Sequence, residues 1–248
     1  MLLVVGGAAA LAQAPPASSS AVASSAAEWV VFVSSRSGDG DLYAVRPDGT
    51  GLRMVLGTEA AEGTVRYDPA RTRLVYHRFS DSGAMLMSGS RALFEDPNGD
   101  VAPAWSTRGE VVYVAERDGR ADLFVADSLG GSVRRLTSDP EVERYPAWSP
   151  DGSRIAFDTF RGGQTEIVVL DLEGMDVTDL TRRPGNDLVP NWSADGGRIV
   201  FGAEVEPGNW DVWIVDTTTL ALTRLTSDPA ADGGPVFVPE AALPPGGP

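Results

Sequence analysis

Apolar and polar residues alternate in short runs along the chain, and the clearest example is the stretch from Pro146 to Phe157. In it Trp148 precedes a Pro-Asp-Gly turn, and Ile155 and Phe157 follow the turn two residues apart. Residues two apart in a strand face the same side, and Gly accepts the positive φ that such turns need. The pattern therefore predicts a short strand, a tight turn and a second strand.

This stretch recurs, and each copy carries an aromatic residue at the equivalent position, which we call the anchor. The anchors are Tyr67, Trp105, Trp148, Trp192 and Phe237. They lie 38, 43, 44 and 45 residues apart. Self-similarity with a period of roughly 40–45 residues is typical of β-propeller blades. A blade is a four-stranded antiparallel sheet that buries its faces against its neighbours, so we expect an all-β propeller.

The repeat resembles a known family. A Pro-Ala-Trp-Ser-Pro-Asp-Gly core at residues 146–152, a following Ile-Ala-Phe, an Asp-Leu-Tyr-type strand and a closing Arg-Leu-Thr are similar to the TolB-type, WD-like propeller repeat. The resemblance covers residues 29–238 and is strongest in the fourth and fifth blades. It implies an exported propeller that binds proteins or peptides. TolB proteins have six blades and an N-terminal α/β domain, neither of which is predicted here.

The number of strands predicts how the ring closes. The middle and outer strands of a blade recur five times, but the innermost strand recurs five times only if residues 235–238 are included. We therefore expect residues 235–238 to lie beside residues 29–34, so that the C-terminal strand completes the first of five blades and removes a free edge. The alternatives are a six-bladed ring or a fragment of a larger propeller. The expected propeller spans residues 28–239, followed by a disordered tail over residues 240–248.

The N-terminal segment, residues 1–27, carries no charged side chain. An apolar run over residues 2–11 precedes small residues that suit signal-peptide cleavage, and an Ala/Ser/Pro linker follows. The run is too short to span a bilayer. We expect a signal-peptide-like segment and a periplasmic or secreted protein without a membrane span. A disordered low-complexity N-terminus is the alternative, and the lack of a preceding Lys or Arg leaves a misassigned start open.

Composition excludes several classes of function. The chain has 248 residues and a net charge of −15, which argues against nucleic acid and favours a cation or a basic protein surface as partner. It has no cysteine, so disulfides, thiol catalysis and Cys-ligated zinc are excluded. His77 is the only histidine and lies in a predicted strand, and no Gly-x-Ser-x-Gly sequence occurs. A Ser-His-Asp hydrolase is therefore not predicted.

The sharpest candidate site is acidic, because a carboxylate precedes every anchor by five residues. The five acids are Glu62, Asp100, Glu143, Asp187 and Asp232. In a propeller this spacing predicts a ring of carboxylates at the channel mouth. Like charges there would raise one another's pKa, and Ca²⁺ or a partner's basic group would relieve the repulsion. The alternative is that each acid accepts local backbone N–H bonds, which is the commoner use of acids in turns.

Two functions follow from this pattern. The first is a non-catalytic scaffold, expected to be a monomer, that binds a protein or peptide through its channel mouth or one face. The second is a glycosidase-like enzyme that uses two of the ring acids as a catalytic pair. Short loops and regular blades favour the scaffold. The sequence does not identify the ligand.

Overall fold

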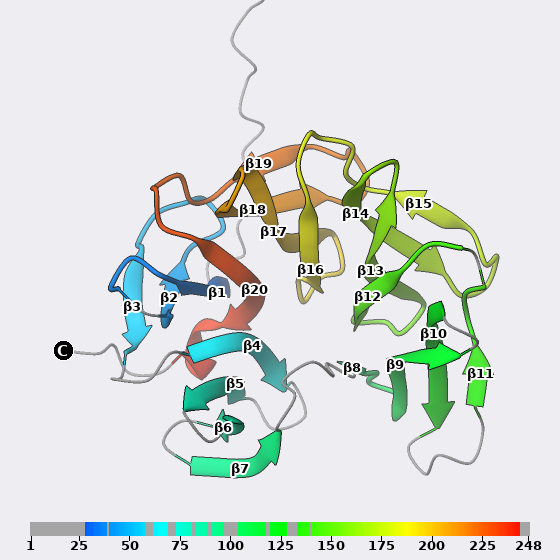
Figure 1. Cartoon of the computed structure of the whole chain (residues 1–248), viewed down its shortest axis with the longest axis horizontal. Coiled ribbons are helices and arrows are strands. Elements are labelled where there is room, and N and C mark those ends of the chain that lie inside the picture. The colour runs from blue at the N-terminus through cyan, green and yellow to red at the C-terminus, as the bar shows by residue number, and fades with distance from the viewer. Residues whose placement is uncertain are drawn as a thin grey trace, which may run out of the picture.

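The computed structural model describes residues 28–38, 40–57, 62–68, 73–80, 83–88, 91–96, 104–117, 120–127, 133–138 and 140–243. In these residues the chain forms five four-stranded antiparallel sheets, arranged around a common centre (Figure 1). The predicted all-β class and four-stranded blades are thus confirmed. The predicted N-terminal segment, residues 1–27, lies outside the described residues.

Each sheet uses strands that follow one another in the chain, except the first, which takes its innermost strand from the C-terminus. The first sheet consists of β20 (Asp232–Pro239), β1 (Glu28–Ser34), β2 (Asp41–Val45) and β3 (Arg53–Leu56). The second consists of β4 (Glu62–Asp68), β5 (Arg73–Ser80), β6 (Gly83–Ser88) and β7 (Arg91–Asp96). The third consists of β8 (Ala104–Trp105), β9 (Glu110–Arg117), β10 (Arg120–Asp127) and β11 (Val133–Arg135). The fourth consists of β12 (Glu143–Trp148), β13 (Arg154–Arg161), β14 (Gln164–Asp171) and β15 (Val177–Asp179). The fifth consists of β16 (Asp187–Trp192), β17 (Arg198–Glu206), β18 (Asn209–Asp216) and β19 (Leu222–Arg224).

The expected pairing of the two ends of the chain is confirmed. Strand β20 runs antiparallel to β1, with Trp29 opposite Val238 and Val30 opposite Phe237. β20 begins at Asp232 rather than at residue 235. The expected disordered tail is wrong at its start, because Glu240–Ala242 form a 3₁₀ turn, and Ala242 and Leu243 pack against the core between the first and second sheets.

The recurring Trp-Ser-x-Asp-Gly stretch folds through its own side chains. Ser149 Oγ accepts the N–H of Arg154 at 2.9 Å and donates to Asp151 Oδ1 at 2.6 Å. Gly152 has φ +67°, the left-handed conformation that the turn requires. Ser193 and Asp195 repeat this arrangement in the fifth sheet. These bonds hold the hairpin between the two innermost strands.

The anchor tryptophans join neighbouring sheets. Trp148 Nε1 donates to the backbone oxygen of Ala104 at 3.0 Å, and Trp192 Nε1 donates to that of Ala147 at 3.1 Å. Each acceptor belongs to the preceding sheet, one period back in the chain. The guanidinium of Arg154 lies 4.6 Å from the Trp192 ring centroid, a cation–π contact across the same junction. The repeat period therefore corresponds to one step around the centre.

Apolar cores fill the junctions between sheets. The second strands carry fully buried Phe157 and Phe201, which pack toward the third and fourth sheets respectively. Extensive strand packing links the third sheet to the fourth, the fourth to the fifth, the fifth to the first and the first to the second. The described strands show no packing of comparable extent between the second and third sheets.

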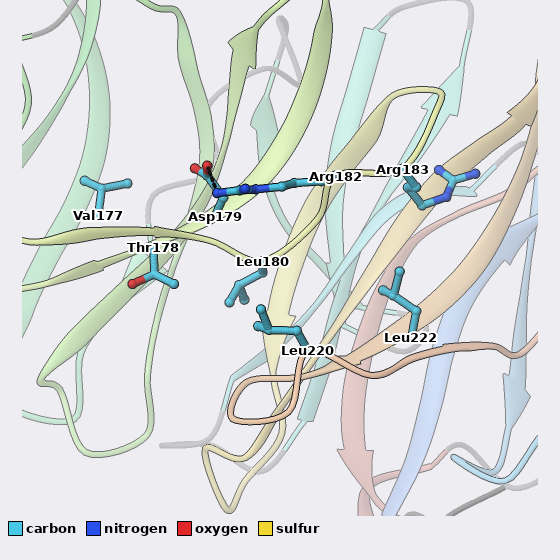
Figure 2. A pocket seen from close by; sticks show the side chains of 8 residues that line it. All are labelled: Val177, Thr178, Asp179, Leu180, Arg182, Arg183, Leu220 and Leu222. Atoms are coloured by element: carbon cyan, nitrogen blue, oxygen red, sulfur yellow. Dashed lines mark hydrogen bonds and ion pairs between the residues drawn. The ribbon is translucent and has the colours of Figure 1, made fainter. Parts of the chain in front are cut away.

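The outer edges of the fourth and fifth sheets enclose a groove of about 600 Å³ (Figure 2). It is lined by residues of β15 and the segment after it, together with Leu220 and Leu222 around the start of β19. In the part of the chain that the structure describes, no helix is long and apolar enough to cross a membrane.

Candidate functional site

The acids predicted at the channel mouth begin the innermost strands. Glu143, Asp187 and Asp232 are the first residues of β12, β16 and β20, and each is 0% exposed. Glu62 begins β4, but its side chain is outside the described residues, and so is the whole of Asp100. The five-residue offset from the anchor therefore marks the start of a strand, not the loop before it. Three of the predicted acids are buried.

A threonine hydroxyl lies beside each of these three acids, six residues earlier in the chain. The threonines are Thr137, Thr181 and Thr226. Each hydroxyl accepts a third-strand backbone N–H of its own sheet at 2.9 Å. Thr137 Oγ1 also donates to Glu143 Oε2 at 2.5 Å. Thr181 donates to Glu166 at 2.7 Å. Thr137 thus connects the third strand of one sheet to the acidic start of the next, whereas Thr181 bonds to a carboxylate of its own sheet.

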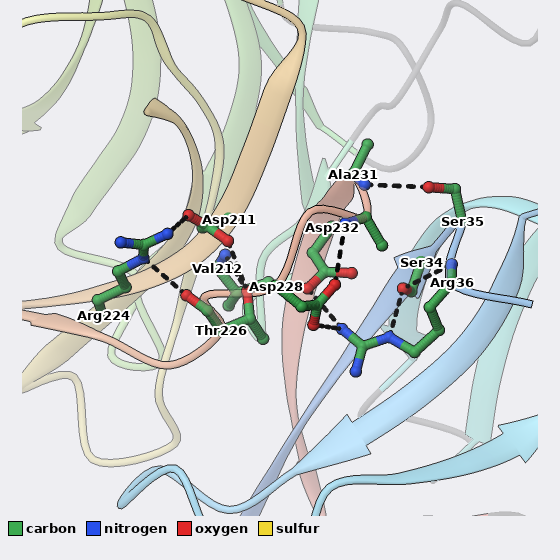
Figure 3. A network of polar contacts seen from close by, with 11 residues as sticks. Ser34, Ser35, Arg36, Asp211, Val212, Arg224, Thr226, Asp228, Ala231 and Asp232 are labelled. Atoms are coloured by element: carbon green, nitrogen blue, oxygen red, sulfur yellow. Dashed lines mark hydrogen bonds and ion pairs between the residues drawn. The ribbon is translucent and has the colours of Figure 1, made fainter. Parts of the chain in front are cut away.

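Arginines neutralise two of these buried acids, Asp187 and Asp232. Arg183 lies 2.6 Å from Asp187, and Arg36 lies 2.7 Å from Asp232. Figure 3 shows the Asp232 network, in which Arg36 also contacts Asp228. On the neighbouring fifth sheet Arg224 pairs with Asp211, which accepts a hydrogen bond from Thr226 at 3.4 Å (Figure 3).

The pKa values of these acids report the balance of burial and pairing. Burial raises the pKa of Asp187 to about 6, while Arg183 opposes the rise. Burial also raises the pKa of Asp211 and of Asp232, against Arg224 and against Ser34 and Arg36 respectively. Loss of water is therefore the dominant effect, and the intramolecular partners only partly compensate for it.

The sequence left two interpretations of these acids, a cation-binding ring and the capping of local backbone N–H groups. The observed partners decide between them only in part. For Asp187 and Asp232 the capping of local backbone N–H groups is wrong, because their partners are arginine, serine and threonine side chains. Among the described residues no group of three or more His, Asp or Glu side chains is placed to hold a metal ion. Calcium binding stays a prediction, because two of the five carboxylates lie outside the described part.

A second polar group, which was not predicted from the sequence, lies on the inner strands. We call it the inner-face cluster: Arg66 on β4, Arg144 and Tyr145 on β12, and Asp158 on β13. Arg144 Nε lies 3.6 Å from Asp158 Oδ2, and the Arg144 side chain is 47% exposed. Burial lowers the pKa of Arg66 to about 10, and Tyr145 and Asp158 oppose this fall. The charges of the cluster thus belong to the second and fourth sheets, whose innermost strands β4 and β12 both border the centre (Figure 1).

Asp158 is the one carboxylate of this cluster. It is 0% exposed, and burial raises its pKa to about 7. The backbone N–H of Val189 on β16 donates to Asp158 Oδ1 at 3.2 Å, and Arg144 and Arg66 also favour the charged form. An acid within the apolar Ala-Phe-Asp run of a predicted strand was the available signal for this site.

Unusual backbone conformations lie beside the cluster. Tyr145 has φ +49° and Val189 has φ +58°. Both lie where the pairing register shifts, in β12 and β16. The equivalent residue of β20 is Gly234, with φ +56°. A β-branched residue at positive φ is a genuine outlier, and bulges of this kind re-aim side chains near functional sites. The inner strands therefore maintain strain around the cluster.

Comparisons with known proteins place the chain among propellers of one type. A family model described as "TolB beta propeller domain" matches residues 142–243. The protein TolB homolog of Chlorobium luteolum is 28% identical over 137 residues, which are 53% of this chain and 31% of that protein. The Tol-Pal system protein TolB of Albidiferax ferrireducens is 33% identical over 107 residues, 43% of this chain and 22% of that protein. The chain thus matches about a third or less of these relatives' length.

Solved structures show the same fold. TolB from Acinetobacter baumannii superposes with a TM-score of 0.52 at 19% identity, over 86% of this chain and 67% of that one. The tricorn protease superposes with a TM-score of 0.55 at 15% identity, over 79% of this chain and 26% of that one. None of these comparisons supports the glycosidase alternative. The repeat, the family match and the fold together identify the chain as a TolB-like β-propeller repeat protein.

Proposed function

We propose that the chain is an exported, non-catalytic scaffold that binds a protein or peptide through the inner-face cluster and the adjoining face. Relatives carry the names TolB homolog and Tol-Pal system protein TolB, and the proposal places this chain in a periplasmic assembly of that kind. The net charge of −15 favours a partner with a basic surface.

The inner-face cluster carries this proposal. Arg144 is half exposed, Tyr145 offers an aromatic ring with a hydroxyl group, and both stand on a strained strand next to a buried acid. Strained backbone is retained where the surrounding structure over-determines it, and such positions concentrate at ligand sites. Guanidinium and phenol groups are also enriched at the energetic centres of protein interfaces. These side chains therefore provide hydrogen-bond donors and apolar area for a peptide.

The proposal includes a five-bladed monomeric ring in which β20 closes the first blade. Its support is the pairing of β20 with β1 and the packing of β20 against β16 and β4. A ring that binds its two ends together leaves no unpaired innermost strand. Sedimentation of the purified chain tests the monomer, since a fragment with an unpaired innermost strand would associate.

The binding role is tested by crosslinked affinity capture from a periplasmic extract, with the wild-type chain and with Arg144→Glu and Tyr145→Gly. We expect both variants to lose the captured partner. Tyr145→Gly also relieves the positive φ, so it should fold at least as well as the wild type. Arg134→Glu, at an exposed position of the outer strand β11, is the matched control and should keep the partner. Equal capture by all four proteins would contradict a role of the inner face.

A further inference from the structure

The groove between the fourth and fifth sheets has an unpaired strand on one wall. In the pairing of β14 with β15, the N–H of Leu180 bonds to Ile167 and the N–H of Asp171 bonds to Asp176. Hydrogen-bonding direction alternates along a strand, so the backbone groups of Val177 and Asp179 point away from β14. Among the described residues these groups have no hydrogen-bond partner. The outer edge of β15 is therefore open to a further strand.

The opposite wall is apolar and partly exposed. Leu220 is 46% exposed and Leu222 is 38% exposed. Figure 2 shows Leu220 next to Leu180. Leu180 directly follows β15 and lines the groove on that side. Leu220 holds a left-handed backbone conformation, with φ +59°, which is costly for a residue with a branched side chain. The turn before β19 thus presents a leucine to the groove instead of burying it.

One end of the groove is locally basic, in contrast to the acidic chain. Arg182, with a side chain that is 80% exposed, lies 3.0 Å from Asp179. Asp179 also lies 3.0 Å from Arg161. Arg183 forms an ion pair with Asp187. Asp179 is thus shared between Arg161 and Arg182, so it only partly neutralises the exposed guanidinium of Arg182. This guanidinium attracts an acidic group.

We propose that this groove binds an extended acidic peptide segment of a partner protein, which adds to β15 as a fifth strand. The segment pairs with the backbone of Val177 and Asp179, places apolar side chains at alternate positions against Leu220 and Leu222, and brings a carboxylate to Arg182. Strand addition of this kind takes affinity from main-chain bonds and specificity from alternate side chains. The groove is on the outer edge, so the proposal is independent of binding at the inner face.

The probe is a short fluorescein-labelled peptide with leucine at alternate positions and aspartate at its N-terminal end, titrated by anisotropy against the full chain. An antiparallel strand brings that end to Arg182. We expect saturable binding that weakens at least tenfold in Arg182→Glu and in Leu222→Ser. A peptide with lysine in place of aspartate should bind at least tenfold more weakly. No binding of the aspartate peptide up to about 1 mM would overturn the proposal.

Val177→Pro separates strand addition from simple contact with the leucines. It removes an outward N–H without removing a bond to β14, and proline is tolerated at the first residue of an edge strand. We expect it to weaken peptide binding at least tenfold while thermal unfolding remains cooperative. Val133→Pro, at the same position of β11, is the matched control and should bind like the wild type. Equal binding by Val177→Pro and the wild type, or equal loss in Val133→Pro, would overturn the proposal.

Discussion

Arg36 lies 2.7 Å from Asp232 although 196 residues separate them in the chain. Arg36 follows β1 and Asp232 begins β20, so the ion pair joins the two ends of the chain at the sheet that they share. Asp232 is completely buried, while Arg36 is largely buried and also contacts the rings of Tyr43 and Phe32. The pair therefore stabilises the junction that connects the first and last strands.

Removal of this arginine should be costly. In Arg36→Ala the carboxylate of Asp232 stays buried without its cation, and we expect a loss of about 3 kcal/mol in the free energy of unfolding. Urea denaturation measures this loss. Arg182→Ala, which removes an exposed ion pair, should change stability by less than about 1 kcal/mol. Equal effects of the two substitutions would show that the Arg36 pair has no special role.

Asp158 should make stability fall as the pH rises. Its pKa in the folded chain is raised to about 7 from 3.8, so the folded state retains a proton that the unfolded state releases. This contribution is fully present below pH 3.8 and is lost as the pH rises through 7. We expect Asp158→Asn to match the wild type near pH 4 and to be more stable at pH 8. Parallel urea-stability curves for the two proteins between pH 4 and 8 would contradict the assignment.

Thr181 should show how much the recurring hydroxyl contributes. Its Oγ1 accepts the N–H of Ile167 and donates to Glu166, and the residue is 1% exposed. Thr181→Val keeps the shape but leaves a buried N–H unpaired, which costs about 1–3 kcal/mol. Thr181→Ser keeps the hydroxyl and should lose less. Thermal unfolding of both variants gives the comparison, and a valine variant as stable as the serine variant would refute the role of the bond.

Calcium binding by the ring acids is decided by thermal unfolding with Ca²⁺ and with a chelator. A cation that binds the folded state must raise the melting temperature by mass action. If Glu62 and Asp100 complete such a site, added Ca²⁺ raises the melting temperature and the Asp100→Asn variant loses the rise. A melting temperature that responds to neither addition would rule out the site. Mg²⁺ serves as the control, because it demands a tighter octahedral geometry.

The periodic features of the fold could be predicted from the sequence because each is local. Trp148 and Trp192 recur at one period and make the same bond to the preceding sheet. The turns of Gly152 and Gly196 need only the residues beside them. The innermost strand occurs five times only if the C-terminal strand is included, and an unpaired edge is unfavourable. These two facts predicted the pairing of β20 with β1.

The polar sites depended on contacts that no local pattern encodes. The carboxylate spacing located Asp187 and Asp232 at strand starts, but which side chains neutralise them is decided by burial and by arginines elsewhere in the fold. Arg66 and Asp158 shift one another's pKa although they belong to the second and fourth sheets, which no local pattern brings together. The sequence by itself therefore determined the repeat and its strands, which follow from short-range periodicity, and the closing strand, which follows from the number of innermost strands. Tertiary structure alone decided which charges are buried together, because that depends on how the sheets are placed around the centre.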